Sequence, residues 1–421
     1  MAPNASEVKA VGREVNPLDL SVIRKAIPAE CFVKSPLKAT LYALFDYGMI
    51  AGSFYSMYTL THSSVWSSLP WWQQAGATSA YWLVTGFFMW CIFVVGHDCG
   101  HGTFSDNEIL NDIVGHLTHG SIMVPYYPWQ VSAGVRCACV DPASCTTIAQ
   151  LLTPPPHPPT TTYQQLSHSE HHKYHNHIDK DYSHPWYTEE RLNKPEEKLA
   201  RMMEGYPSVR ALFPIVGWIL YLYGMPDGCH FIPFASQRMW REHPQERSKC
   251  VLSALVVVAY AWLLFHLFNY DVKQVAYWYG GPALVYGWWL VAVTYLQHHN
   301  PETQVYGDED WKFVNAAFET VDRTYGFGID WLHHHITDGH VAHHLFFTKI
   351  PHYNLPKATV AIRQHLEKAG LSKLYKYELT RDFFYRTHSY MVQFGFKSHQ
   401  DKTLSDIASE RAKGKKGVKG E

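Results

Sequence analysis

Apolar residues in this chain gather in long blocks that are almost free of charge. Five blocks approach the length of about 20 residues that crosses a bilayer, and they cover residues 42–60, 80–95, 209–225, 251–268 and 276–297. The first block contains one acidic residue, Asp46. The pattern predicts an all-α integral membrane protein.

The block at 209–225 differs from the other four. It begins beside Arg210, contains Pro214 and is followed by Pro226, so we expect a helix that lies in the membrane interface. The remaining four blocks predict four transmembrane helices, arranged as two hairpins, with a helical cap outside the bilayer. A set of buried core helices in a soluble protein is the less favoured alternative.

The link at 61–79 contains no Lys or Arg but has three Trp residues. By the positive-inside rule, this link faces the lumen and both termini face the cytosol. The first 25 residues lack the basic-then-apolar order of a secretory signal. We expect a cytosolic N-terminal segment (1–40), a membrane-bound domain (41–400) and a basic tail (401–421) in a multi-pass protein of the endoplasmic reticulum.

Composition narrows the function. The 36 Lys and Arg residues balance 37 Asp and Glu residues, for a net charge of −1, which disfavours nucleic-acid binding. The eight Cys residues form no C-x-x-C pair, so reducing conditions are favoured over a disulfide framework. The 27 His residues direct attention to metal binding.

Histidines recur in three short boxes. In the first, His97 and His101 are four residues apart and share one face of a helix. The second and third boxes both read H-x-x-H-H and supply His168, His171 and His172, then His340, His343 and His344. We expect each of these two boxes to direct three imidazoles to a common point. Eight imidazoles exceed the needs of one tetrahedral ion and suit two metal ions.

The predicted topology places the three boxes on one side of the membrane. The first box follows the second apolar block, and the second box lies in the same loop. The third box joins them if an even number of crossings intervenes. Because 209–225 is assigned to the interface, two crossings intervene, and all three boxes face the cytosol.

Boxes of these types in this order resemble those of the membrane-bound fatty acid desaturases. The stretches GHDCGHGTFSD, VDRTYG and HITDGHVAHHLFFTKIPHYNLPKAT, with KAIPAECF near the start, are similar to the methyl-end group, the Δ12 and ω-3 desaturases, over most of residues 20–400. The first box looks more like ω-3 members and the third more like Δ12 members. The resemblance therefore leaves the position of the new double bond open.

The resemblance implies two non-haem iron ions that use O2 and two electrons to insert a cis double bond into an unsaturated acyl chain of C18 or longer. It also implies a ninth imidazole from a Gln-His pair after the last span, which we assign to His298. His299 is its alternative, and His334 is a candidate for an extra metal site or for a group that supports the ligands from outside. The implied iron ligands are His97, His101, His168, His171, His172, His298, His340, His343 and His344.

Electrons must come from another protein, because the chain has neither a G-x-G-x-x-G dinucleotide motif nor a His-Pro-Gly-Gly haem motif. The resemblance implies cytochrome b5 with its NADH-dependent reductase as donor, and a fatty acyl lipid or acyl-CoA as substrate. The Glu-x-x-His pair of carboxylate-bridged di-iron bundles does not occur in the sequence.

The remaining histidines lack the repeated spacing. We expect them to hydrogen-bond in loops or between helices, and they include His116, His119, His175, His177, His184, His352 and His388. The run from His333 to His335 reads equally well as a polar helix surface.

Two other functions fit parts of the pattern. A hydroxylase, ketolase or sterol oxidase would share the di-iron scaffold and the first hydrogen abstraction. A histidine-rich metal transporter is the alternative from another class, but transporters place ionisable groups at mid-membrane, and these boxes lie outside the spans.

Residues 131–165 depart from the resemblance. They contain three Cys and a Pro/Thr-rich run without apolar periodicity, which predicts a disordered insert. We interpret the insert as a retained intron, because Val-Ser can be encoded as GTGAGT and a closing Gln as CAG. A lineage-specific loop and a small Cys/His metal site are the alternatives. The mature transcript would decide.

Overall fold

The computed structural model describes residues 16–129, 167–181, 183–194, 197–224, 229–300 and 302–398. The insert at 131–165 and the basic tail at 401–421 lie outside these residues, so the intron interpretation and the division into three segments stay predictions.

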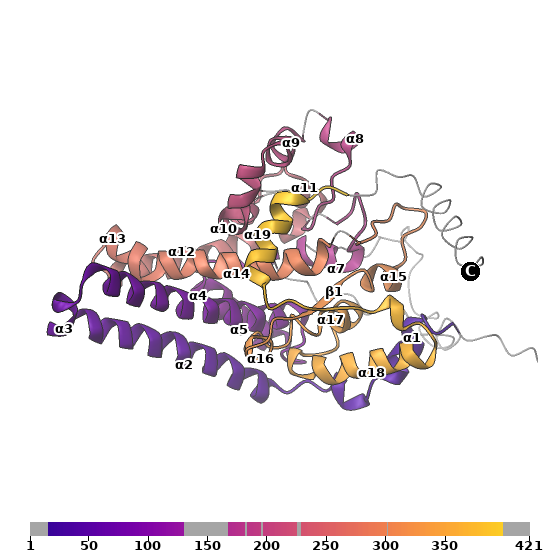
Figure 1. Cartoon of the computed structure of the whole chain (residues 1–421), viewed down its shortest axis with the longest axis horizontal. Helices are drawn as coiled ribbons and strands as arrows, with labels where there is room; N and C mark the ends of the chain where they lie inside the picture. The colour runs from indigo at the N-terminus through magenta and orange to yellow at the C-terminus, as the bar shows by residue number, and fades with distance from the viewer. Residues whose placement is uncertain are drawn as a thin grey trace, which may run out of the picture.

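Four long helices stand at four of the apolar blocks (Figure 1). They are α2 (Pro36–Thr61), α4 (Trp71–His101), α12 (Arg247–Leu267) and α14 (Gly281–His298). The side chain of Ser35 caps α2 by accepting from the Lys38 N–H at 3.3 Å, and α4 ends at Gly102 in the left-handed conformation with φ 68°. Helix α4 therefore continues through the first histidine box.

Helices α4 and α14 pack together in the interior, and α2 and α12 lie outside them. The outer faces of α2 and α12 expose large apolar side chains such as Leu41, Tyr55, Leu255 and Val258, as expected of surfaces that contact lipid. Two segments, Trp71–Gly100 and Pro244–Leu267, are long and apolar enough to cross a membrane.

The hairpin tips and the histidine boxes lie at opposite ends of the helical stack (Figure 1). The tips are formed by α3 (Ser64–Ser68) and α13 (Val272–Val275). The boxes on α7 (Ser167–Tyr174) and α17 (His340–Phe346) lie beside the C-terminal ends of α4 and α14. The predicted topology of four transmembrane helices with all boxes on one side of a membrane stays a prediction.

The fifth apolar block forms α10 (Pro207–Tyr223), which contains Pro214 and packs on α14 and on α19 (Phe383–Gln393). Trp218 and Leu222 are buried on one face of α10, whereas Leu212 is exposed on the other. The interfacial position of this helix stays a prediction.

Shorter helical elements complete the described structure: α1 (Leu20–Ala26), η1 (Ala29–Phe32), α5 (Glu108–Ser121), α6 (Tyr126–Trp129), α8 (Glu189–Leu192), α9 (Lys198–Gly205), α11 (Arg238–Glu242), η4 (Pro244–Glu246), η5 (Ala276–Gly280), α15 (Phe313–Ala317), α16 (Ile329–Leu332), η6 (His352–Asn354), α18 (Leu355–Lys368) and η7 (Ser372–Leu374). The element η5 is a π-turn that leads into α14.

A two-stranded parallel sheet, which the all-α prediction omitted, pairs β1 (Val321–Thr324) with β2 (Lys376–Leu379). Four-residue strands are too short to show a period in the sequence. The buried Arg323 of β1 donates from Nε to the Leu296 carbonyl at 2.7 Å and from Nη1 to the Glu378 carboxylate at 2.5 Å. The sheet therefore holds the C-terminal end of α14.

The neighbouring Asp322 holds the start of α17. Its carboxylate accepts from the Val341 N–H at 2.8 Å and from the Tyr375 hydroxyl. Burial outweighs these hydrogen bonds and raises the pKa of Asp322 to about 7. The native state therefore favours the protonated carboxyl more strongly than the unfolded chain does.

We predict that the Asp322 carboxyl lowers the free energy of unfolding as pH rises. The native state binds a proton that the unfolded chain releases near pH 4, so Asp322 costs up to about 1.4 kcal/mol per pH unit between its two pKa values. The Asp322→Asn variant should lose this slope. Thermal unfolding of the purified chain between pH 5 and 8 measures it, with the exposed Asp310→Asn as control; parallel profiles for all three proteins would contradict the prediction.

Candidate metal centre

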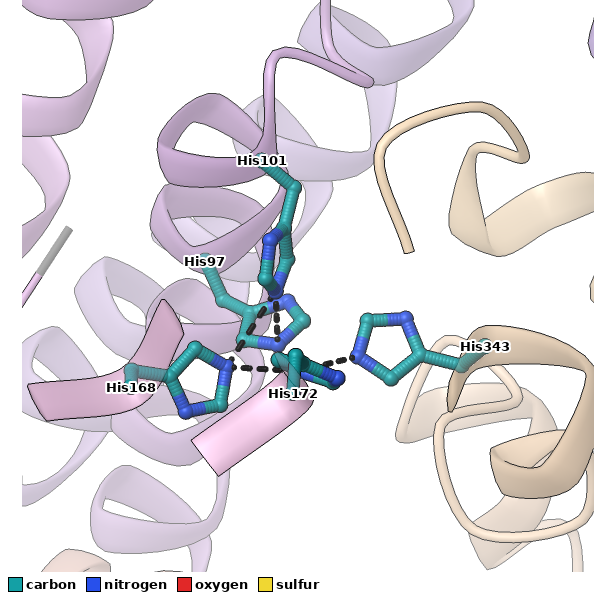
Figure 2. A group of neighbouring side chains, drawn as sticks. All are labelled: His97, His101, His168, His172 and His343. Atoms are coloured by element: carbon teal, nitrogen blue, oxygen red, sulfur yellow. Dashed lines mark hydrogen bonds between the residues drawn. The ribbon is translucent and has the colours of Figure 1, made fainter. Parts of the chain in front are cut away.

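Nine histidines from four segments meet in two adjoining clusters. We call the five residues His97, His101, His168, His172 and His343 the first cluster; one ring nitrogen of each lies within 4.8 Å of the others. Figure 2 shows these five rings converging from α4, α7 and α17. Two further groups share His298, one with His171 and His184 and the other with His340 and His344. We call the four of these residues that belong to the boxes or to the Gln-His pair, His171, His298, His340 and His344, the second cluster.

The second and third boxes do not each point to one place, which corrects the sequence expectation. His168 and His172 join the first cluster and His171 joins the second. In the third box, His343 joins the first cluster, whereas His340 and His344 join the second. Each residue of an α-helix turns by about 100°, so positions i+3 and i+4 lie on opposite sides of position i. One H-x-x-H-H box can therefore serve two sites.

Several ring nitrogens of the first cluster each face two other ring nitrogens, which is more partners than one imidazole nitrogen can bind by hydrogen bonds. The Nε2 atom of His101 lies 3.0 Å from that of His97 and 3.2 Å from that of His168. The Nε2 atom of His172 lies 3.0 Å from that of His168 and 3.2 Å from that of His343. A neutral imidazole nitrogen offers one hydrogen or one lone pair, not both, so each shared atom has one partner too many.

A metal ion removes this conflict. Two nitrogens bound at about 2.1 Å and at right angles lie about 3.0 Å apart, which agrees with the spacing of these rings. In the second cluster, the Nε2 atom of His298 lies 3.2 Å from that of His171 and 3.1 Å from that of His340. Both clusters thus have the separation of neighbouring ligands on one ion.

The clusters are also electrostatically suited to a cation. Burial and the neighbouring imidazoles hold the pKa values of His172 and His343 well below the usual range. Burial lowers the pKa of His340 to about 3. These three rings are therefore neutral at physiological pH and present lone pairs, which is the form that binds metal.

Hydrogen bonds outside the clusters orient several rings. The Asp181 carboxylate accepts from Nδ1 of His171 at 2.9 Å, and the Ile336 carbonyl accepts from Nδ1 of His340 at 3.0 Å. Each bond places the proton on Nδ1 and directs the Nε2 lone pair at the cluster. The Asp98 carboxylate lies 3.7 Å from Nδ1 of His97.

The structure separates the alternatives at the Gln-His pair and in the His333–His335 run. His299 stacks on Trp186 and Tyr295, away from both clusters, whereas His298 faces the second. His333 and His334 are buried, so the interpretation as a polar helix surface is wrong for them. His334 is instead held by Asp46 at 2.8 Å, because the turn after α16 folds inward.

Several of the remaining histidines have the hydrogen bonds expected of them. His116 contacts Ser253, His177 contacts Asp308, His352 contacts Asp98 and His388 contacts Trp288. His184 is different, because one of its ring nitrogens lies within 4.8 Å of ligand atoms of His171 and His298. No repeated spacing marks His184 in the sequence.

A cavity of about 130 Å³ adjoins both clusters. Its apolar wall comes from α4, α10 and α14, and includes Val94, Phe213, Trp218, Leu290 and Val291. Imidazoles of both clusters border the same space, among them His97, His168, His298 and His344. An apolar chain in this cavity would lie directly against the clusters.

Fold and site together define a helical protein with apolar outer faces and a paired, histidine-rich centre beside an apolar cavity. The chain belongs to the fatty acid desaturase family, whose family model matches residues 149–377. It is 36% identical to the Delta(12) fatty acid desaturase fat-2 of Caenorhabditis elegans, over 94% of this chain and 93% of that protein.

Two further relatives extend the comparison. The chain is 31% identical to the omega-3 fatty acid desaturase fat-1 of Caenorhabditis elegans, over 94% of this chain and 86% of that protein. It is 32% identical to the endoplasmic reticulum omega-3 fatty acid desaturase of Nicotiana tabacum, over 84% of this chain and 79% of that protein. The similarity to the Δ12 and ω-3 groups that the motifs indicated is confirmed.

We predict that Asp181→Asn weakens metal binding about 10- to 100-fold, because an asparagine cannot accept the Nδ1–H of His171 as a carboxylate does. Competition for iron with a chelator, using the purified chain, measures the effect. Asp308→Asn is the matched control, because Asp308 pairs with His177 outside both clusters. Equal iron affinities in the two variants would contradict the role of Asp181.

Proposed function

We propose that this enzyme inserts a cis double bond toward the methyl end of an unsaturated acyl chain of C18 or longer, as a Δ12 desaturase (oleate to linoleate) or an ω-3 desaturase. The observation that carries the proposal is the pair of imidazole clusters bordering an apolar cavity. The relatives named as Δ12 and omega-3 desaturases support the methyl-end class.

We propose that the nine imidazoles hold two iron ions. The donor set fits, because the first cluster offers five nitrogens and the second offers four. Bound iron would supply, with O2 as co-substrate, the oxidising power that removes hydrogens from unactivated carbons, which side-chain acids and bases cannot do at neutral pH. The histidines act as ligands in this proposal, and the described chain contributes no separate acid–base group.

The protein's own part in the reaction is positioning. Apolar side chains of the cavity, such as Val94 and Leu290, would hold the acyl methylenes against the clusters and exclude water. The Asp181 and Ile336 contacts fix two of the rings. The cavity wall on α10 and α14 would determine which methylenes lie beside the metal ions.

We further propose four transmembrane helices in the endoplasmic reticulum membrane, with the clusters and both termini on the cytosolic side. The apolar outer faces of α2 and α12 and the position of both hairpin tips opposite the boxes support this topology. A cytosolic centre is accessible to cytochrome b5 and its NADH reductase, the proposed electron donors. The substrate would be an acyl lipid or acyl-CoA.

The fatty-acid profile of yeast that expresses the chain tests the function. The full chain and a form without 131–165 should be compared, with and without added linoleate. New dienoic acid from endogenous oleate would establish a Δ12 enzyme, and trienoic acid only after feeding would establish an ω-3 enzyme. Hydroxylated or keto acids would instead favour the hydroxylase or ketolase alternative.

The His343→Ala variant should reduce the new product to background, because it removes one nitrogen from the first cluster. His388→Ala is the matched control, since His388 contacts Trp288 and lies outside the clusters. A product that survives His343→Ala, with the variant present in membranes at the wild-type level, would count against the metal centre. Exchangeable zinc in place of tightly bound iron would favour the transporter alternative.

We predict that Val291→Trp lowers product formation about tenfold or more while leaving the iron content unchanged. The larger side chain would occupy the cavity that α14 borders, and overpacking of this kind costs about 1–3 kcal/mol. Val258→Trp on the exposed face of α12 is the control. Product analysis and metal analysis of the same membranes measure both effects; an unchanged product level would show that the acyl chain lies elsewhere.

A further inference from the structure

The second cluster has one imidazole fewer than the first when only the three boxes and His298 are counted. Four rings belong to it, whereas five belong to the first cluster. His184, which lies outside every box, is a fifth imidazole at this place and the tenth when both clusters are counted. Its ring centroid is 4.5 Å from that of His171 and 4.6 Å from that of His298.

These separations equal those between members of the cluster. The rings of His171 and His298 are 4.5 Å apart, and those of His298 and His340 are 5.0 Å apart. One ring nitrogen of His184 lies within 4.8 Å of the ligand atoms of both His171 and His298. Within the described part of the chain, the ring nitrogens of His184 have no hydrogen-bond partner that would otherwise account for its position.

The loop that carries His184 is fixed by the carboxylate that also orients His171. Asp181 accepts the backbone N–H of His184 at 3.1 Å and Nδ1 of His171 at 2.9 Å. The N–H of Asn176 donates to the same carboxylate at 3.1 Å. One buried carboxylate therefore sets the distance between the two imidazoles.

The residues on either side of His184 are held as well. The hydroxyl groups of Ser183 and Tyr221 lie 3.1 Å apart, which joins the loop to α10. Trp186 stacks on His299, and the Tyr187 N–H donates to the Phe396 carbonyl at 2.9 Å. The fold therefore holds the His184 ring beside the second cluster.

We propose that His184 is a ligand of the metal ion in the second cluster, so that each of the two ions has five imidazoles available. The inference rests on the proposed function, because it assigns His184 to the same pair of metal ions. It adds a metal-binding residue that the box spacing does not reveal. His184 also borders the apolar cavity.

The test compares the full purified chain, loaded with iron-57, with the His184→Gln and His388→Gln variants. The time course of iron release to a chelator gives the rate at which each ion leaves, and the Mössbauer spectrum reports the surroundings of each ion separately. In His184→Gln we expect one of two ions to leave at least about tenfold faster and one of two spectral components to change. His388→Gln should match the wild type in both measurements.

A second variant covers a failure of His184→Gln to fold. His184→Glu keeps a metal-binding side chain, because carboxylates also bind iron. It should release the ion more slowly than His184→Gln does, while still changing one spectral component. Wild-type release and spectra in whichever variant folds would overturn the inference while the proposed function stands. A wild-type chain that binds no iron would overturn both.

Discussion

The close approach of buried imidazoles is the constraint on which the rest of the structure depends. Nε2 atoms that face one another at 3.0 to 3.2 Å cannot all be satisfied by hydrogen bonds, because each neutral nitrogen has one hydrogen or one lone pair. A cation bound between the rings would accept a lone pair from each of these nitrogens. Long helices, a small sheet and several buried carboxylates hold the rings in this arrangement.

The imidazoles are held close together because the helices and the strand that carry or contact them meet at one end of the helical stack. Helix α4 carries two of the rings on its last turns, and α14 carries His298 at its C-terminal end. Arg323 of β1 binds the carbonyl of Leu296, two residues before His298. Asp322 of the same strand binds the first turn of α17. Two adjacent residues of one short strand therefore hold the start of α17 and the end of α14, which together carry three of the four rings of the second cluster.

The same arrangement places the centre beside helices with apolar outer faces. Helices α4 and α14 are buried between outer helices whose exposed faces are apolar, and the cavity lies where α10 closes over them. A substrate that is itself apolar can then reach a polar, metal-binding site without exposing that site to bulk water. The position of α10 therefore affects access to the cavity as well as the predicted topology.

The sequence by itself determined the helical blocks, the three boxes and the family, because hydrophobic runs and short motifs are local properties. Only the tertiary structure decided that each H-x-x-H-H box divides between two clusters, that His299 and His333 turn away, and that His184 lies beside the second cluster. Those outcomes depend on contacts between segments far apart in the chain, such as the Asp46–His334 pair. No spacing along the sequence encodes such contacts.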